Sequence, residues 1–159
     1  MDLLDFEALD RGMPLKEVVK ELKQKSKMSE DDLKLIKMKD IEKLLNSEIG
    51  KLMKKACIEK RLFREQEFYA GLSAKELNIA DSEELVVIQG VVDAYIEDEH
   101  EVTIIDYKTD RVRSEEEFLK RYSEQLKYYA IAISKATGKK IKDKLIWSFE
   151  LGKEIRCID

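Results

Sequence analysis

Two runs of sequence decide how this chain is expected to fold. They are Leu85-Val86-Val87-Ile88-Gln89-Gly90-Val91-Val92-Asp93-Ala94-Tyr95-Ile96 and Val102-Thr103-Ile104-Ile105-Asp106-Tyr107-Lys108. Both are rich in β-branched residues, which is typical of strands. The polar residues 97–101 between them favour a turn. The two runs therefore predict an antiparallel β-hairpin.

The predicted hairpin places three charged side chains together. If its turn centres on residues 98–101, Asp93 lies directly opposite Asp106. Side chains of directly paired residues point to the same face, with Cβ atoms about 5 Å apart. Lys108 lies two residues beyond Asp106 and shares that face. Two carboxylates and one ammonium are therefore expected to converge at one end of the hairpin.

This arrangement favours a metal site over an ordinary polar surface. Two neighbouring carboxylates repel each other unless a positive charge lies between them. Hard oxygen ligands prefer Mg²⁺, with Mn²⁺ as an alternative, and such an ion can activate water for attack on a phosphodiester. Taken alone, an aspartate and a lysine two residues apart on a strand are usually a simple ion pair, so the neighbouring sequence has to support the hypothesis.

The rest of the chain predicts helices first and then mixed strands and helix. Pro14 suits the first turn of one helix, Ser29 followed by acidic residues caps a second, and Asp40 caps a third with an apolar stripe through Met53. After residue 61 the pattern predicts strands at about 62–69, 85–96, 102–108, 144–151 and 154–158, with a loop at 71–82. A long helix is expected from Ser114 to about residue 136, closed by Gly138.

On that long helix, Gln125 and Tyr129 are four residues apart and therefore lie on one face. Both have polar tips that can reach the end of the preceding strand. Gly90, three residues before Asp93, leaves room for another group to approach the strand closely.

The expected fold class is mixed α/β (α+β): a central mixed sheet flanked by helices, preceded by a helical segment. Residues 1–57 form that segment and residues 58–159 the core, together one domain. Apolar residues are 43% and charged residues 40% of the chain, with a net charge of -4. These mixed charges indicate a solvated surface, while the net acidity means that any DNA binding must rest on a local site or a partner.

The sequence shows neither a membrane-spanning pattern nor a secretion pattern. No apolar run is long enough to cross a membrane, and no secretion signal is present. Cys57 and Cys157 lack the close spacing of metal ligands and are expected to stay reduced, which favours a cytoplasmic location.

Three motifs in order resemble a known family. They are Gly90-Val91-Val92-Asp93, Asp106-Tyr107-Lys108-Thr109-Asp110 and Gln125-Leu126-Lys127-Tyr128-Tyr129. Together they resemble the RecB-like nuclease domains of the PD-(D/E)XK superfamily, which have a restriction-endonuclease-like core. The closer likeness is to the C-terminal nuclease domain of the AddA family. AddA proteins are the helicase–nuclease subunits of bacterial double-strand-break repair complexes.

The resemblance implies roles for individual residues. Asp93, Asp106 and the Tyr107 carbonyl would bind Mg²⁺, and Lys108 would be the catalytic lysine. Gln125 would hold the lysine or DNA, and Tyr129 would support the site or contact DNA. Glu65, on the strand before the hairpin, has at most a supporting role. The implied function is metal-dependent DNA cleavage, and the implied partners are helicase domains in the same natural chain and a second, AddB-like subunit.

The sequence also departs from the family. Relatives carry a histidine on a helix before the region where this chain opens, and the sole histidine here, His100, falls in the predicted hairpin turn. We therefore expect an excised domain that is weakly active or inactive alone if that histidine is required. The chain has no Walker glycine–lysine motif and is not itself the motor.

Three alternatives stay open at this point. One is a standalone exonuclease of the same fold, although the CRISPR-adaptation type needs four cysteines for its iron–sulfur cluster. Another is a module that binds DNA or a partner without cutting. The last is an α/β domain with an unrelated role.

Overall fold

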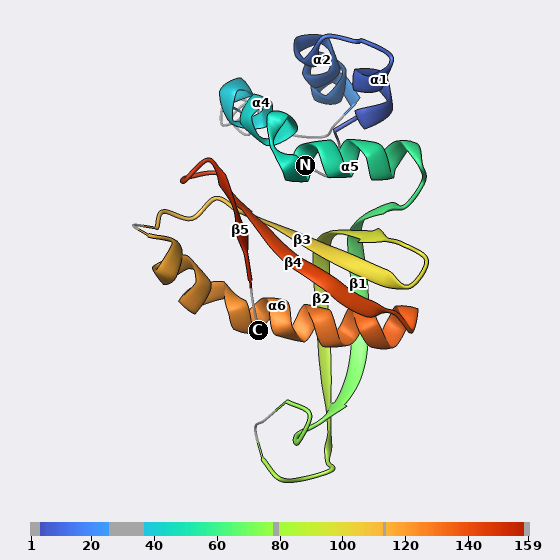
Figure 1. The fold of residues 1–159 in the computed structure, drawn as a ribbon, viewed down its shortest axis with the longest axis vertical. Coiled ribbons are helices and arrows are strands. Elements are labelled where there is room, and N and C mark those ends of the chain that lie inside the picture. The colour runs from blue at the N-terminus through green and yellow to red at the C-terminus, as the bar shows by residue number, and fades with distance from the viewer. Residues whose placement is uncertain (1–3, 26–36, 78–79, 113, 158–159) are drawn as a thin grey trace.

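A computed structural model describes residues 4–25, 37–77, 80–112 and 114–157. Within them lies one five-stranded mixed sheet with the order β1-β2-β3-β4-β5 (Figure 1). The strands are β1 (Leu62–Ser73), β2 (Leu85–Glu97), β3 (Glu101–Lys108), β4 (Lys140–Ser148) and β5 (Lys153–Arg156). All neighbours are antiparallel except β3 and β4, which are parallel. The predicted hairpin is therefore β2–β3, and β3 is the central strand.

Helices cover both faces of the sheet. One face carries α6 (Glu115–Thr137), and the other carries α5 (Glu48–Ile58) with α4 (Met38–Asn46), α1 (Phe6–Asp10) and α2 (Leu15–Lys25) beyond it (Figure 1). Apolar side chains of both sheet faces are buried, including Ile104 towards α6 and Ile105 towards α5. The predicted mixed sheet with helices on both faces is confirmed.

The helical segment differs from the prediction at Ser47. The sequence pattern predicted one helix from Asp40 through Met53, but the structure has two, α4 and α5, joined at that serine. The Ser47 hydroxyl accepts a hydrogen bond from Gly50 N (3.1 Å) and so caps α5. Gly50 is needed there because a Cβ would lie 2.0 Å from the Leu44 carbonyl oxygen. Asp40 lies in the first turn of α4, and Lys37 occupies the cap position. The Ser29-capped helix falls outside the described residues.

The hairpin register agrees with the prediction. Ala94 pairs with Ile105 and Ile96 with Thr103, which is the register that sets Asp93 opposite Asp106. The strand β1 extends to Ser73, past the start of the predicted loop, because its pairing with β2 continues to Leu85.

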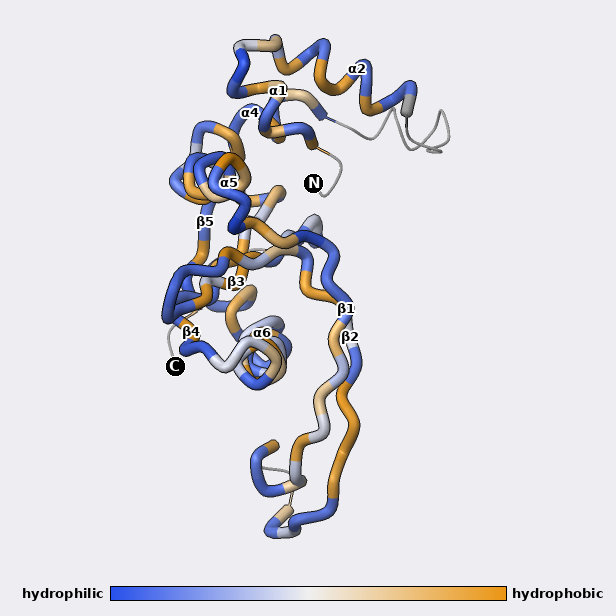
Figure 2. Tube along the Cα trace, turned by 90° about the vertical axis from the view of Figure 1, so that its right-hand side faces the viewer, coloured by the Kyte–Doolittle hydropathy of each residue, from blue (hydrophilic) through white to orange (hydrophobic). Residues whose placement is uncertain are grey.

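The β1–β2 pair bends at Asp93. Val92 and Tyr95 are three residues apart, yet both pack into the core under α6, so the alternation of faces shifts between them. On β1, Glu65 has a φ of 49°, and it lies between the paired residues Arg64–Ala94 and Gln66–Val92. Figure 2 shows the β1–β2 ribbon passing across α6, which is seen end-on, and extending well beyond it.

In the C-terminal half, α6 is capped at both ends and connects β3 to its parallel neighbour β4. Ser114 Oγ accepts from Glu117 N (3.2 Å), and Gly138 ends α6 in the left-handed conformation (φ 71°), as predicted. The prediction of β4 at 144–151 was wrong by four residues at its start and by three at its end, since β4 ends at Ser148. The strand begins at Lys140 because it pairs with β3 from Glu101 onward and places Ile141 against the α6 core. A turn containing Gly152 (φ 61°) leads to β5, as expected.

Residues from both predicted segments share one core. Phe6, Leu44 and Met53 pack with Ile105 and Trp147, and all five are buried. No helix among the described residues is long and apolar enough to cross a membrane.

Candidate active site

Asp93 lies where strand β2 leaves strand β3. The backbone pairing of the two strands ends at Ala94–Ile105. One residue further, Asp93 Oδ2 accepts a hydrogen bond from the backbone N–H of Tyr107 (2.7 Å). The carboxylate therefore takes the place of a strand carbonyl, which fixes it against β3 beside Asp106.

Asp106 and Lys108 form a buried ion pair. Lys108 Nζ lies 2.6 Å from Asp106 Oδ2, and their side chains are only 14% and 2% exposed. The approach is close but not aligned as a hydrogen bond, and Asp106 Oδ2 has no hydrogen-bond partner. A buried carboxylate oxygen without a well-aligned donor is costly and suits a cation. The Lys108 side chain is thus largely covered, although it lies at the end of β3.

The environment of Asp106 disfavours its charge. Burial raises the pKa of this carboxyl from 3.8 to about 6, the Lys108 ammonium opposes that rise, and the Asp93 carboxylate adds to it. The repulsion from Asp93 means that the two carboxylates are near enough to interact, as the hairpin register predicted. The site is thus short of positive charge despite Lys108.

Gln125 and Tyr129 lie close to each other on α6. Gln125 Nε2 donates to the Tyr129 hydroxyl (2.5 Å). Burial raises the pKa of Tyr129, the hydrogen bond from Gln125 lowers it, and the charge of Asp106 raises it. The tyrosine is therefore within electrostatic reach of the site. No direct contact joins Gln125 to Lys108 among the interactions of the described residues.

Gly90 makes room for the Phe68 ring, which packs against Tyr129. A Cβ on Gly90 would lie 2.9 Å from the Phe68 ring and 3.6 Å from the Tyr129 ring. These two rings meet edge to face, with centroids 5.5 Å apart. The expectation of a close approach at Gly90 was right, and aromatic rings make it.

Sequence reasoning did not identify Tyr122 as part of the site. The Lys108 ammonium lies 4.9 Å from the centroid of the Tyr122 ring. Tyr122 precedes Gln125 by three residues and Tyr129 by seven, so all three share one helix face. That spacing was the signal that could have identified it.

The remaining candidates divide between the two sides of the sheet. The Tyr107 side chain points to the α5 side, where its hydroxyl donates to Met53 Sδ (3.0 Å), so only its backbone belongs to the site. Glu65 is exposed and lies beside Asp93 in the β1–β2 register. His100 is exposed in the β2–β3 turn and is not brought to the site.

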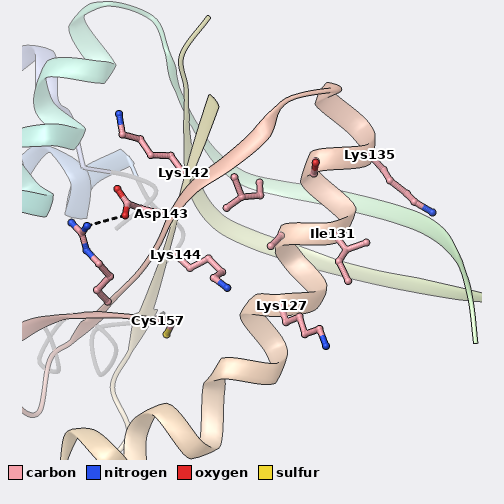
Figure 3. A pocket seen from close by; sticks show the side chains of 11 residues that line it. Lys127, Ile131, Lys135, Lys142, Asp143, Lys144 and Cys157 are labelled. Carbon is pink, nitrogen blue, oxygen red and sulfur yellow. Dashed lines mark ion pairs between the residues drawn. The ribbon is translucent and has the colours of Figure 1, made fainter. Parts of the chain in front are cut away.

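The described residues contain no cluster of three or more histidine, cysteine, aspartate and glutamate side chains that could hold a metal. The site instead offers two carboxylates and the backbone of Tyr107. A separate hollow of about 800 Å³ lies between α6 and β4 (Figure 3). It is lined by residues such as Ile131 and Lys144, and none of the site residues lines it.

A buried carboxylate at the end of a central strand, with a second carboxylate and a lysine beside it, is the type of site that phosphodiester-cleaving metalloenzymes use. A family model described as the PD-(D/E)XK nuclease superfamily matches residues 7–155. The chain therefore belongs to the PD-(D/E)XK nuclease superfamily, as a nuclease domain with the restriction-endonuclease-like fold.

Similar curated proteins are ATP-dependent helicase/nuclease subunits that are much longer than this chain. The chain is 35% identical over 165 residues to that of Clostridium beijerinckii, covering 99% of this chain and 13% of that protein. It is 29% identical to the one from Lachnoclostridium phytofermentans (98% and 14%) and 34% identical to the one from Clostridium kluyveri (94% and 12%). The resemblance to AddA is thereby confirmed, and the chain spans about one eighth of the length of these relatives.

Proposed function

We propose that this chain is a Mg²⁺-dependent deoxyribonuclease domain of a helicase–nuclease polypeptide that acts in double-strand-break repair in the cytoplasm. Membership of the nuclease superfamily and likeness to helicase/nuclease subunits support this function. The single observation that carries it is Asp106, a buried carboxylate that has no aligned hydrogen-bond donor at Oδ2 and lies beside Asp93 and Lys108.

Asp93, Asp106 and the Tyr107 carbonyl are the proposed metal ligands. All three offer hard oxygen atoms, which Mg²⁺ prefers and Mn²⁺ accepts. Mg²⁺ keeps several waters when it binds proteins, so three protein ligands are enough. The raised pKa of Asp106 supports the assignment, because a bound cation would supply the positive charge that the site lacks. When bound, the ion would polarise the phosphodiester and lower the pKa of a coordinated water.

Lys108 is the proposed catalytic residue. Attack on a phosphodiester adds negative charge, and an ammonium placed at the site offsets that charge or orients the attacking water. Gln125 and Tyr129 support the site: the hydrogen bond between them fixes the hydroxyl near Asp106. Glu65 is a proposed supporting residue only.

DNA is the proposed substrate, and the chain's net charge of -4 means that other protein surface must help to hold it. We propose that helicase domains in the same natural polypeptide and a second, AddB-like subunit supply that surface. The name of the relatives, which joins helicase and nuclease, and their greater length support the first of these partners.

Replacing Lys108 with alanine tests the proposal. We expect Lys108→Ala to reduce cleavage of linear single- and double-stranded DNA by ~10²–10³, the usual effect of removing one electrostatic contact to a transition state. Lys120→Ala is the matched control, because Lys120 is an exposed lysine of α6. Both variants are compared with the parent chain at saturating Mg²⁺ and Mn²⁺, with EDTA as blank and circular dichroism to check folding.

Undiminished cleavage by a folded Lys108→Ala variant would remove Lys108 from the mechanism. Binding of DNA without cleavage in any metal, in the full helicase–nuclease polypeptide, would favour the non-cleaving module. End-labelled and circular substrates then separate exonuclease from endonuclease action.

A further inference from the structure

The ring of Tyr122, on α6, covers the ammonium of Lys108, at the end of β3. The nitrogen lies 4.9 Å from the ring centroid, within the range where an aromatic face attracts a cation. The same ammonium lies 2.6 Å from Asp106 Oδ2. The lysine therefore has two electron-rich partners, one charged and one neutral. Its side chain is only 14% exposed, so water screens neither interaction strongly.

The ring is itself held in place. Its centroid lies 4.9 Å from that of Phe118, which is fully buried. Burial raises the pKa of its hydroxyl, the carboxylate of Asp110, two residues after Lys108, adds to that rise, and Arg121 on the same helix opposes it. The Tyr122 ring is thus packed against α6's buried Phe118 independently of the lysine. Arg121 lies further from the same ring, 6.0 Å from its centroid.

In the proposed function, Asp106 both binds the metal ion and pairs with the Lys108 ammonium, and these two roles conflict. A carboxylate oxygen that binds a metal ion has less electron density for an ammonium, and the ion itself repels the ammonium. An aromatic face attracts a cation without competing for the metal, because it carries no net charge. A lysine that relied on Asp106 alone would lose its position when the carboxylate bound metal.

We propose that Tyr122 is the positioning residue for Lys108, holding the ammonium at the site independently of Asp106. This role for Tyr122 rests on the proposed function. It would explain how the lysine stays in place when the metal site beside it is occupied. The geometry that carries it is the ring–ammonium contact and the separate packing of the ring against buried Phe118.

An NMR experiment without metal tests the contact directly. In chain labelled with ¹³C-lysine, the ε-methylene protons of Lys108 should be shifted upfield by the ring current of Tyr122. The signal is assigned by its loss in Lys108→Arg. We expect the upfield position to persist in Tyr122→Phe, which keeps the ring, and in Asp106→Asn, which removes the charged partner. In Tyr122→Leu it should move to the position of exposed lysines.

Tyr128→Leu is the matched control, because Tyr128 lies on the same helix and its hydroxyl donates to Glu124 instead (2.9 Å). In DNA cleavage, Tyr122→Leu should lower kcat about tenfold, as the loss of a desolvated cation–π contact predicts. The metal concentration for half-maximal rate should not change. Tyr122→Phe should retain the rate of the parent chain, and so should Tyr128→Leu.

Two results would overturn the inference: a Lys108 signal that does not move in Tyr122→Leu, or one that loses its upfield shift in Asp106→Asn. A parent chain and full polypeptide that cleave no DNA would refute the proposed function instead. The NMR comparison would still decide whether Tyr122 holds the lysine.

Discussion

Without metal, the buried carboxyl of Asp106 should make the protein less stable as the pH rises. Its pKa is raised from 3.8 in the unfolded chain to about 6 in the fold, mainly by burial. The folded state therefore binds this proton more tightly than the unfolded state does. Between these two pH values the free energy of unfolding decreases with rising pH, and above about pH 6 this contribution is constant. A pKa difference of about 2 corresponds to about 3 kcal/mol.

The prediction is tested by comparing the parent chain with Asp106→Asn, which cannot titrate. Urea unfolding followed by circular dichroism in EDTA gives the free energy of unfolding at several values from pH 4 to 8. The stability of Asp106→Asn relative to the parent should increase by about 2.4 kcal/mol across this range, because part of the total lies below pH 4, and most of the change should occur below pH 6. The difference between the two proteins cancels the titration of all other carboxylates.

Asp81→Asn is the control, because the side chain of Asp81 is 92% exposed. Its stability relative to the parent should stay nearly constant over the same pH range. If the difference between Asp106→Asn and the parent were equally flat, Asp106 would not be a strained buried carboxyl. The argument that the site lacks positive charge would then fail.

Two further predictions concern the packing around the site. Gly90→Ala should lower the free energy of unfolding by about 1–3 kcal/mol, because the new Cβ would press on a buried aromatic ring 2.9 Å away. Gly71→Ala, on the same ribbon, meets nothing within 4 Å and should be neutral or slightly stabilising in the same urea titration. Ser47→Ala should cost about 1 kcal/mol through loss of the α5 cap, measured by thermal unfolding. Ser123→Ala, an exposed serine inside α6, should instead leave the melting temperature nearly unchanged; equal effects would refute the capping argument.

Sequence by itself determined the features that depend on neighbours along the chain. The β2–β3 register followed from the position of one turn, because side chains alternate with a period of two and a short turn leaves little freedom. That register set Asp93 opposite Asp106 and put Lys108 beside them. The ends of α6 followed from Ser114 and Gly138, because caps act within one helical turn.

Only the tertiary structure decided how the site is enclosed. The bend at Asp93, the burial of Asp106 and the ring of Tyr122 over Lys108 all depend on where α6 packs against the sheet. Period and propensity do not encode that packing, because it joins residues distant in sequence. The early start of β4 at Lys140 has the same origin. It depends on pairing with β3, and the whole of α6 separates these two strands in the sequence. The local sequence pattern thus identifies the charged residues of the site. Long-range packing sets the pKa of Asp106 and the contacts of Lys108.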